Sequence, residues 1–523
     1  MIETDILVIG AGPAGLATAL KLKRGGFSGR VVVLDKAKAA GNHVLSGAVI
    51  DPAGFKELLS EAEIAALPCE CGVRKESFRF VFGEGASVKI PWVPPMMRSH
   101  GYPIGSLAKV VKYLAQLAEA DGVEIYHGFA ASGLLKENGR IVGARTGEKG
   151  VDAQGERKGN YLASEEIRAK LVVLAEGAAG YNTQRLIKEE RLQGGRPQVY
   201  ALGIREVIEL AEPVPGSAGE IMHTFGYPVD MLTYGGGFVY RPNDRQVMVG
   251  FAVGLDYRDA ALQPHELFRR FKATKTVQAH IKGGKPVAYG AKLIPEGGFY
   301  ALPRPYAAGA LIVGDGAGLV DGLRIKGVHL ALESGVAAAE AILGGLDGVG
   351  ERYWQLLKAT PGYSEVRRVK NVHGGFSYCA PIGVMMAGFA WATFGRLPWW
   401  PVGRVHRDCE TLREIRKAAE TGKKLKAEGP DRLTDVFLSG TVHDEDQPCH
   451  LKIGDMAKCD ECARQFGSPC TRFCPAEVYR READGSLRID FSNCLHCKTC
   501  EVKCPFGNLT WTPPQGGDGP RYT

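Results

Sequence analysis

The sequence predicts a mixed α/β and α+β protein with a Rossmann-type nucleotide-binding fold, an inserted antiparallel sheet and a C-terminal ferredoxin-like domain. Three observations support this prediction. A strand, a glycine-rich turn and a helix follow one another at residues 4–24. Alternating apolar and polar residues recur between 201 and 299, and eight of the 13 cysteines lie between 459 and 504.

The composition is that of a folded, soluble protein. Of the 523 residues, 45% are hydrophobic and 24% are charged. This balance excludes a disordered or fibrous chain, and the length allows several domains. The net charge of +7 is small for this length, so we expect no nucleic-acid partner.

The first residues bear on the cellular location. The opening MIETDILVIGAG carries an acid and a strand pattern where a targeting segment would carry a basic region and an apolar core. We therefore expect no signal or transit peptide, and a reducing cytosol around the thiols. In that compartment, dense cysteines indicate metal or redox chemistry rather than disulfides.

A dinucleotide fingerprint follows the first β-branched run. Gly10, Gly12 and Gly15 form a GxGxxG turn that leads into a helix, and the next strand ends at Asp35, 20 residues after Gly15. Glycines at these positions let the backbone approach a pyrophosphate, and an acid at this spacing binds a ribose hydroxyl. A glycine-rich turn without a ligand would not explain Asp35.

A second half-site favours FAD over NAD. The strand at 311–313 ends in Gly314 and Asp315, and a helix rich in small residues follows. We expect Asp315 to hold the ribityl chain and the helix to point its N-terminus at the isoalloxazine. The alternative is a turn with only a packing role. The predicted FAD-binding domain is discontinuous and covers 1–200 and 300–370, whereas 201–299 reads as antiparallel strands of an inserted domain.

Two cysteine sets predict a ferredoxin-like iron–sulfur domain at 441–523. The run CxxCxxCxxxCP at 494–505 is typical of [4Fe–4S] clusters, and in two-cluster ferredoxins its fourth cysteine serves the other cluster. The predicted ligands are Cys474, Cys494, Cys497 and Cys500 for one cluster, and Cys459, Cys462, Cys470 and Cys504 for a second. Structural zinc is the alternative for the upstream cysteines, because separated pairs also suit a tetrahedral ion.

An apolar segment is predicted at 371–403. No charged residue lies between 374 and 395, a length that could cross a bilayer. Pro381, several glycines and Trp391, Trp399 and Trp400 instead favour a segment that lies in the membrane interface. A buried core, a partner surface and a true membrane span are the alternatives.

The next segment, 404–440, is rich in charges of both signs and predicts a charged linker helix. A solvated helix between two domains is one interpretation. Contact with anionic headgroups is the other, because the apolar segment is its neighbour.

At this point the chain closely resembles the electron transfer flavoprotein:ubiquinone oxidoreductase family, in stretches such as GNHVLSGAVIDP (41–52), MHTFGYPVDMLTYGGGFVY (222–240), DRLTDVFLSG (431–440) and NCLHCKTCEVKCP (493–505). The resemblance covers nearly the whole chain in order. It implies an enzyme that passes electrons from reduced electron transfer flavoprotein through a [4Fe–4S] cluster and FAD to a membrane quinone. It also implies monotopic attachment to a membrane surface, which we expect to be the cytoplasmic face of a bacterial inner membrane.

The resemblance also implies roles for particular residues, and it makes 201–299 a quinone-binding domain. The implied residues are Tyr234, Gly235 and Gly236 in the quinone pocket, His43, Ser46, Asp315 and Gly327 at the FAD, and Tyr479 and Thr499 near the cluster sulfurs. Hydrogen bonds from the last two would tune the cluster potential.

The cysteine content departs from the family, whose single cluster uses residues matching Cys474, Cys494, Cys497 and Cys500. In its additional cysteines the tail resembles the ferredoxin subunit of the FixC/FixX type. Two other functions therefore stay open: a quinone-reducing component of an electron-bifurcating complex, and a soluble FAD reductase of an organic double bond, like geranylgeranyl reductases. The apolar segment favours a quinone. No acid or base near the TYGG motif stands out as a proton donor.

Overall fold

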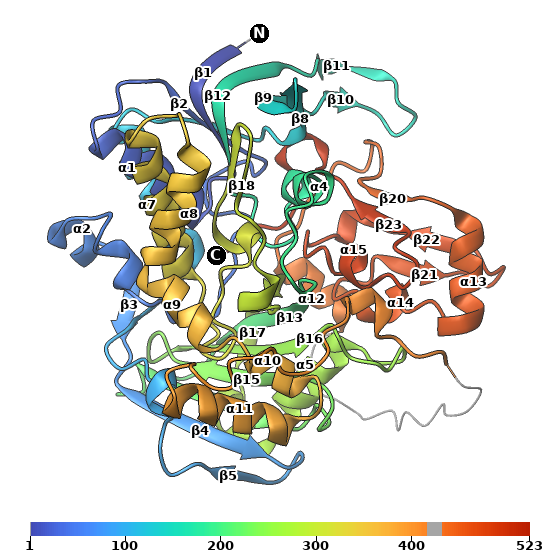
Figure 1. Ribbon diagram of the computed structural model, residues 1–523. Coiled ribbons are helices and arrows are strands. Elements are labelled where there is room, and N and C mark those ends of the chain that lie inside the picture. The colour runs from blue at the N-terminus through green and yellow to red at the C-terminus, as the bar shows by residue number, and fades with distance from the viewer. Residues whose placement is uncertain (1, 416–430, 523) are drawn as a thin grey trace.

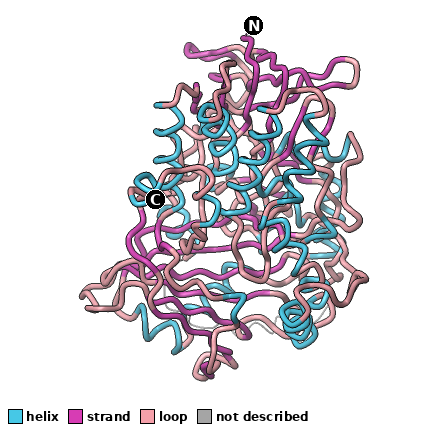
Figure 2. The backbone as a smooth tube through the Cα atoms, turned by 60° about the vertical axis from the view of Figure 1, so that its left-hand side comes forward, coloured by secondary structure: helices cyan, strands magenta, loops and turns pink. Residues whose placement is uncertain are grey.

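The computed structural model describes residues 2–415 and 431–522. Its two large sheets lie one above the other in Figure 1, with helices beside the upper sheet and the cysteine-rich region at the right. Figure 2, a view turned by 60°, shows strands of the lower sheet crossing beneath the helical half of the molecule.

The upper sheet is the predicted Rossmann-type sheet. Its eight strands run in the order β18-β19-β12-β1-β2-β7, with β9 beside β12 and β8 beside β9. They are β1 (Ile2–Ile9), β2 (Val31–Asp35), β7 (Glu124–His127), β8 (Ala131–Glu137), β9 (Arg140–Thr146), β12 (Glu166–Leu174), β18 (Tyr306–Ala307) and β19 (Ala310–Ile312). The central strands pair in parallel and consist of buried Val, Ile and Leu, as is typical of a sheet covered on both faces.

Helices pack on this sheet and share its hydrophobic core. They are α1 (Pro13–Arg24), α2 (Glu61–Ala65), α3 (Leu107–Ala120), α4 (Tyr181–Glu189), α7 (Val328–Leu343), α8 (Val349–Ala359) and α9 (Pro361–Arg368). α1 and α7 approach closely because Gly335 has no side chain: a Cβ there would lie 2.3 Å from the carbonyl oxygen of Ala14. The predicted strand, helix and second strand are confirmed as β1, α1 and β2.

The lower sheet has seven strands in the order β17-β13-β16-β15-β14-β4-β5. They are β4 (Lys75–Val81), β5 (Ser87–Lys89), β13 (Tyr200–Glu209), β14 (Glu220–Gly226), β15 (Gly235–Tyr240), β16 (Gln246–Gly254) and β17 (Lys285–Pro295), and α5 (Pro264–Ala273) and α6 (Lys275–Ile281) accompany them. The sheet is not confined to 201–299. β4 and β5 come from the first 100 residues, and β4 pairs in parallel with β14.

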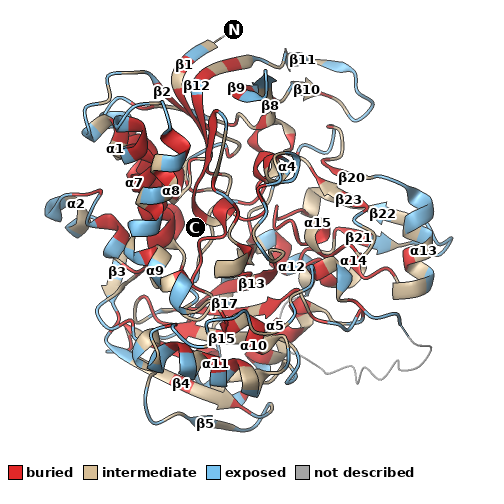
Figure 3. Cartoon of the chain, viewed as in Figure 1, coloured by how far each residue is buried: buried red, intermediate tan, exposed pale blue. Residues whose placement is uncertain are grey.

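The apolar segment folds into α10 (Val372–Phe376) and α11 (Ala380–Ala392). In the part of the chain that the structure describes, no helix has the length and apolar character needed to span a membrane. Figure 1 shows α11 at the same lower end of the molecule as β4 and β5. Much of its surface is exposed or half-buried in Figure 3, although its residues are apolar.

The predicted linker helix is wrong over 404–415. Only a 3-10 turn, Asp408–Glu410, forms there, and residues 416–430 lie outside the described residues. The segment is anchored to the core at Asp408: Tyr200 N–H donates to buried Asp408 Oδ2 at 3.1 Å, and Lys503 Nζ donates to Asp408 O at 2.9 Å. Hydrogen bonds to these internal partners therefore hold Asp408 in place without a helix. Helix α12 (Arg432–Leu438) then begins the C-terminal region.

The C-terminal region contains short strand pairs and helices, as expected for a ferredoxin-like domain. They are β20 (Leu451–Ile453) with β23 (Leu509–Trp511), β21 (Tyr479–Arg481) with β22 (Leu487–Ile489), α13 (Met456–Phe466), α14 (Cys470–Phe473) and α15 (Thr499–Lys503). This region shares one hydrophobic cluster with the lower sheet, so the two are packed together. The smaller pairs β3 (Cys69–Gly72) with β6 (Pro103–Gly105), and β10 (Lys149–Val151) with β11 (Arg157–Leu162), complete the fold.

Candidate functional site

A cavity of about 850 Å³ runs between the two sheets. It begins at the glycine-rich turn after β1, passes Asp315 and the start of α7, and reaches β15 and the apolar segment. Lys498 and Trp511 of the cysteine-rich region form another part of its wall. One cavity therefore joins residues of the FAD half-sites, the lower sheet, the apolar segment and the cysteine-rich region.

The glycine-rich turn is shaped so that one of its glycines faces open space. A Cβ on Gly10 would lie 2.3 Å from Ala175 O, and one on Gly15 would lie 2.0 Å from Gly10 O, so these two glycines permit close backbone packing. A Cβ on Gly12 would meet no atom within 4 Å. Because Gly12 lines the cavity and caps α1, the space beside it suits the pyrophosphate of a dinucleotide.

Asp35 is held at the end of β2 by backbone donors. Ala11 N–H donates to Asp35 Oδ2 at 2.7 Å, and Ala37 N–H donates to Oδ1 at 2.7 Å. These bonds connect the carboxylate to the glycine-rich turn. A carboxylate has further acceptor sites, so Asp35 can still bind a ribose hydroxyl.

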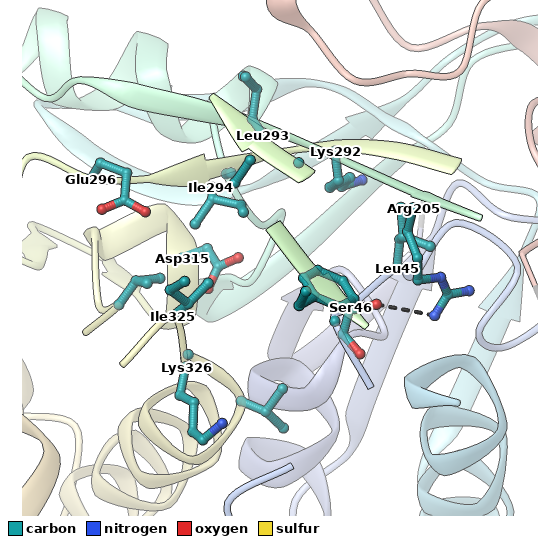
Figure 4. Close-up of a pocket in the computed structure, with 18 of the residues that line it drawn as sticks. Leu45, Ser46, Arg205, Lys292, Leu293, Ile294, Glu296, Asp315, Ile325 and Lys326 are labelled. Carbon is teal, nitrogen blue, oxygen red and sulfur yellow. Dashed lines mark hydrogen bonds between the residues drawn. The ribbon is translucent and has the colours of Figure 1, made fainter. Parts of the chain in front are cut away.

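In the second predicted FAD half-site, Asp315 and Gly327 are neighbours. A Cβ on Gly327 would lie 3.6 Å from Asp315 Oδ1, and Gly327 is the N-cap of α7. Desolvation raises the pKa of Asp315 to about 6, and the positive charge of Lys292 opposes this shift. Figure 4 shows Asp315 and Lys292 around the same space, and Lys292 Nζ donates to His43 O at 3.3 Å.

His43 and Ser46 lie on the loop that follows β2. The imidazole Nδ1 of His43 is 2.5 Å from Lys36 Nζ, and its ring meets that of His496 edge to face at 5.2 Å. The carbonyl oxygen of Ser46 accepts a hydrogen bond from Arg205 Nη1 at 3.0 Å, drawn as a dashed line in Figure 4. His43 therefore lies between the cavity and the cysteine-rich region.

Tyr234, Gly235 and Gly236 lie together on the cavity wall at the start of β15. The Tyr234 hydroxyl donates to Gly322 O at 3.0 Å, and its ring packs edge to face on Phe376 of α10 at 4.9 Å. A Cβ on Gly236 would lie 2.6 Å from Thr224 O. These contacts place the TYGG motif directly against the apolar segment.

The apolar segment connects this end of the cavity to the surface. Phe376, Val384 and Trp391 line the cavity. Outside it, the side chains of Phe394 and Trp399 are 71% and 74% exposed. A continuous apolar surface thus leads from the exterior to the TYGG motif.

The eight clustered cysteines are free and fall into the two predicted groups. The thiols of Cys474, Cys494, Cys497 and Cys500 act on one another electrostatically, whereas Cys504 and Cys459 act on Cys462. Cys497 Sγ is 3.3 Å from Thr499 Oγ1. Tyr479 lies beside Cys500, and burial together with this thiol raises the pKa of Tyr479.

The sulfur spacing distinguishes a cluster from zinc. A tetrahedral zinc with Zn–S bonds of about 2.3 Å would hold its sulfurs roughly 3.8 Å apart. Within the described chain, which includes all eight cysteines, no three of these sulfurs lie within 4.8 Å of one another. A cubane spreads its ligands over four irons and keeps them farther apart, and the CxxCxxCxxxCP spacing of the inner group is typical of such clusters.

Some residues of the site gave no sequence signal. Lys292 and Glu296 reach the cavity from β17 and the residue after it, and buried Lys498 donates to Ala179 O at 2.7 Å across the boundary with the upper sheet. Lys498 could have been suspected, because it lies inside the cysteine run. His443, His450 and His496 gather beside Cys494, with ligand atoms within 4.8 Å of one another.

Comparison with known proteins agrees with this site. The family model described as electron transfer flavoprotein-ubiquinone oxidoreductase, 4Fe-4S, matches 429–523, and the ETF-QO ubiquinone-binding model matches 200–294. A model of FAD-dependent oxidoreductases matches 5–77. The electron transfer flavoprotein-ubiquinone oxidoreductase of Pseudomonas aeruginosa is 37% identical over 99% of this chain and 98% of its own length.

The chain belongs to the electron transfer flavoprotein-ubiquinone oxidoreductase family. Eukaryotic members are also similar. The mitochondrial proteins of Arabidopsis thaliana and Homo sapiens are each 34% identical, over 100% and 99% of this chain and 84% and 89% of their own lengths.

Solved structures show the flavoprotein fold of this family member. A geranylgeranyl bacteriochlorophyll reductase-like protein from Thermoplasma acidophilum aligns with a TM-score of 0.52 and 19% identity, over 75% of this chain and 96% of that one. At this identity the likeness concerns the fold alone. The family matches, in contrast, extend over the cysteine-rich region.

Proposed function

We propose that this protein oxidises reduced electron transfer flavoprotein and passes the electrons through a [4Fe–4S] centre and FAD to a quinone in the membrane. The single cavity between the two sheets carries this proposal. It joins the glycine-rich turn, the TYGG motif and the apolar segment, and it borders the residues next to the inner cysteines. Membership of the oxidoreductase family supports the same reaction.

FAD fits the upper part of the cavity. Gly10, Gly12, Gly15 and Asp35 would hold the ADP half, and Asp315 the ribityl chain. His43, Ser46 and Gly327 would then border the isoalloxazine. FAD supplies the two-electron capacity that joins one-electron donors to a quinone.

The inner cluster is assigned to Cys474, Cys494, Cys497 and Cys500. His43 and His496 make an edge-to-face contact between these ligands and the cavity. His43 lines the cavity and His496 directly precedes Cys497, so this contact connects the inner group to the cavity. Thr499 and Tyr479 would donate hydrogen bonds to cluster sulfurs and so tune the potential.

The quinone is assigned to the lower end of the cavity, against Tyr234, Gly235 and Gly236. The backbone of a glycine pair offers hydrogen-bonding groups without a side chain to block a flat ring. The apolar walls exclude water from the headgroup and suit its isoprenoid tail.

The exposed aromatic residues of the apolar segment support peripheral attachment to a membrane. Helix α11, which ends two residues before Phe394, lies at the lower end of the molecule in Figure 1, and its Val384 and Trp391 line the cavity. Exposed Trp and Phe at a helix too short to span favour an interfacial position. The expected membrane is the cytoplasmic face of a bacterial inner membrane.

These exposed aromatics favour the quinone over the other two functions. A soluble reductase of an organic double bond would not need aromatic side chains as exposed as Phe394 and Trp399. A component of an electron-bifurcating complex would have the same quinone site. Copurification of partner subunits would distinguish that function.

A vesicle assay tests the membrane part. Phe394→Asp/Trp399→Asp changes two exposed residues outside the cavity lining, so the quinone site is left intact. We expect this variant to leave sedimenting vesicles and to lose reduction of long-chain quinone, while it still reduces a water-soluble quinone. Leu162→Asp, at an exposed position on β11, is the control and should stay bound. Unchanged vesicle binding of the double variant would refute the anchor.

A further inference from the structure

The family's single cluster leaves four cysteines without a role: Cys459, Cys462, Cys470 and Cys504, here called the outer quartet. All four line one small cavity of the cysteine-rich region, and no cysteine of the inner group lines it. The relevant question is whether the outer quartet is a ligand set or a group of unrelated thiols.

Each of the two cysteine runs in the sequence contributes one cysteine to the other group. α15 ends next to Cys504, only four residues after inner Cys500, yet the electrostatic neighbours of Cys504 are the outer thiols. Conversely, α14 begins at outer Cys470 and ends next to Cys474, which acts electrostatically on inner Cys500 and does not line the cavity of the outer quartet. This reciprocal crossing is the arrangement of two-cluster ferredoxins.

The outer sulfurs also have donors of the kind that stabilise thiolates. Asn508 donates from its backbone N–H to Cys504 Sγ at 3.4 Å and from Nδ2 to Cys459 Sγ at 3.2 Å. Arg481 donates to Cys459 O at 2.7 Å, which brings a positive charge to the edge of the quartet. A negatively charged cluster would be stabilised by both.

We propose that the outer quartet binds a second [4Fe–4S] cluster. Figure 1 shows α13, which carries Cys459 and Cys462, at the outer edge of the molecule, and α15 nearer its centre. The second cluster would therefore lie on the side of the inner one that faces away from the FAD cavity. It adds one further one-electron site to the protein and extends the proposed function without depending on it.

Iron counting with EPR tests this proposal. Anaerobically purified protein should contain about eight irons per chain, four per cubane, and its reduced spectrum should show the broadening of two interacting spins. Cys459→Ala/Cys462→Ala should retain about four irons and give an unbroadened spectrum of one cluster. Cys449→Ser, half-buried outside both groups, is the matched control and should keep the full iron content.

The outcomes that overturn the proposal are equally definite. Four irons in the wild-type protein would refute it, and four irons with one zinc would assign the outer quartet to zinc. If the double variant fails to fold, the iron content and the spin count of the wild-type protein still determine whether one or two clusters are present. Quinone reduction is not part of this test, so failure of the proposed function would be seen separately.

A second, independent observation concerns a buried carboxyl at the quinone end of the cavity. Glu296 is 5% exposed, lines the cavity and makes no ion pair with any described residue. Figure 4 shows its carboxylate extending from the residue after β17. A Cβ on Gly322 would lie 2.2 Å from Glu296 Oε2, so the carboxylate rests on the same loop that accepts the Tyr234 hydrogen bond.

Three other titratable groups act electrostatically on Glu296: His373, Asp321 and Asp256. His373 of α10 lies edge to face with Tyr234 at 5.7 Å, and its Nε2 is 3.3 Å from Asp256 Oδ2. The Asp256 side chain is 20% exposed. Asp321, on the loop after Asp315, is the remaining acid that faces the group. Desolvation raises the pKa of Glu296 to about 8, so it carries a proton at neutral pH.

We infer that Glu296, which lines the cavity beside the loop that Tyr234 contacts, delivers protons to the quinone and is reprotonated from solvent. Quinone takes two electrons from the flavin and two protons to become quinol. Each proton leaves the Glu296 carboxyl for a quinone oxygen, and a proton from solvent replaces it. This inference rests on the proposed function, because it needs the quinone at Tyr234.

Glu296→Gln keeps the shape of the side chain and removes the proton. We expect quinone reduction to fall about 100-fold while FAD content and flavin reduction by the donor stay unchanged. The remaining activity should lose the wild-type decline near pH 8, and Glu296→Asp should restore part of the rate. Glu333→Gln, a buried carboxyl on α7 outside the cavity lining, is the control.

Wild-type rate and pH profile in Glu296→Gln would overturn the inference. A wild-type protein that takes electrons from the flavoprotein but reduces no quinone would instead refute the proposed function. The two failures are therefore distinguishable.

Discussion

Gly12 offers the sharpest test of the FAD site, because protein stability and FAD binding can be separated there. A side chain at this position meets no protein atom within 4 Å, and the backbone is extended, with φ −82°. Gly12 is also the N-cap of α1, where Asp is one of the preferred residues. Gly12→Asp should therefore fold at least as well as the wild type.

The same substitution places a negative charge where the pyrophosphate would lie. A charge pair about 4 Å apart costs roughly 4 kcal/mol at an effective dielectric constant of 20. This corresponds to about a 1,000-fold loss in FAD affinity. The purified variant should lack the flavin absorbance and retain its iron. Gly159→Asp, at an exposed glycine of β11 whose Cβ would also meet no atom within 4 Å, should keep the flavin.

The assay is flavin and iron content per chain, with thermal unfolding of the FAD-loaded and FAD-free forms. Full flavin content in Gly12→Asp would refute the pyrophosphate assignment. Loss of both flavin and iron would indicate a folding defect, which the cap preference makes unexpected.

Two further predictions concern stability. Burial lowers the pKa of His223 to about 3, so below about pH 6.5 the unfolded chain binds a proton at His223 that the folded chain does not. The free energy of unfolding should therefore fall by about 2 kcal/mol between pH 7 and pH 5. In urea unfolding, His223→Leu should remove this loss, and an unchanged pH dependence would contradict the prediction. Buried Lys503 donates to Tyr257 O, Asp408 O and Thr411 Oγ1 at 2.9–3.0 Å, and Lys503→Met should cost roughly 2 kcal/mol because it leaves these acceptors unpaired. A melting temperature equal to that of the wild type would contradict the second prediction.

The local motifs could be predicted from the sequence because their physical causes are local. β1, the glycine-rich turn and α1 follow directly from a β-branched run, residues that permit tight backbone packing, and helix formers. The cysteine spacing likewise predicts a ligand grouping, and the structure places all eight cysteines in one C-terminal region, where the grouping stays a prediction.

Other features depend on long-range pairing, which no local pattern encodes. β4 joins the lower sheet through pairs such as Lys75 with Glu220. Glu296 and Lys292 become site residues only because β17 passes over the cavity. The segment 404–415 has the composition of a solvated helix, but buried Asp408 and its partner Lys503 fix it in another conformation.

Anaerobic mixing of reduced electron transfer flavoprotein with this protein on quinone-containing vesicles tests the proposed electron route most directly. Wild-type protein should form quinol, with cluster and flavin absorbance changing before the quinol appears. Cys497→Ser, which removes an inner ligand and leaves the FAD cavity untouched, should keep its flavin and form almost no quinol, whereas Cys449→Ser should match the wild type. Quinol formation at the wild-type rate by Cys497→Ser would show that the inner cluster is not on the route.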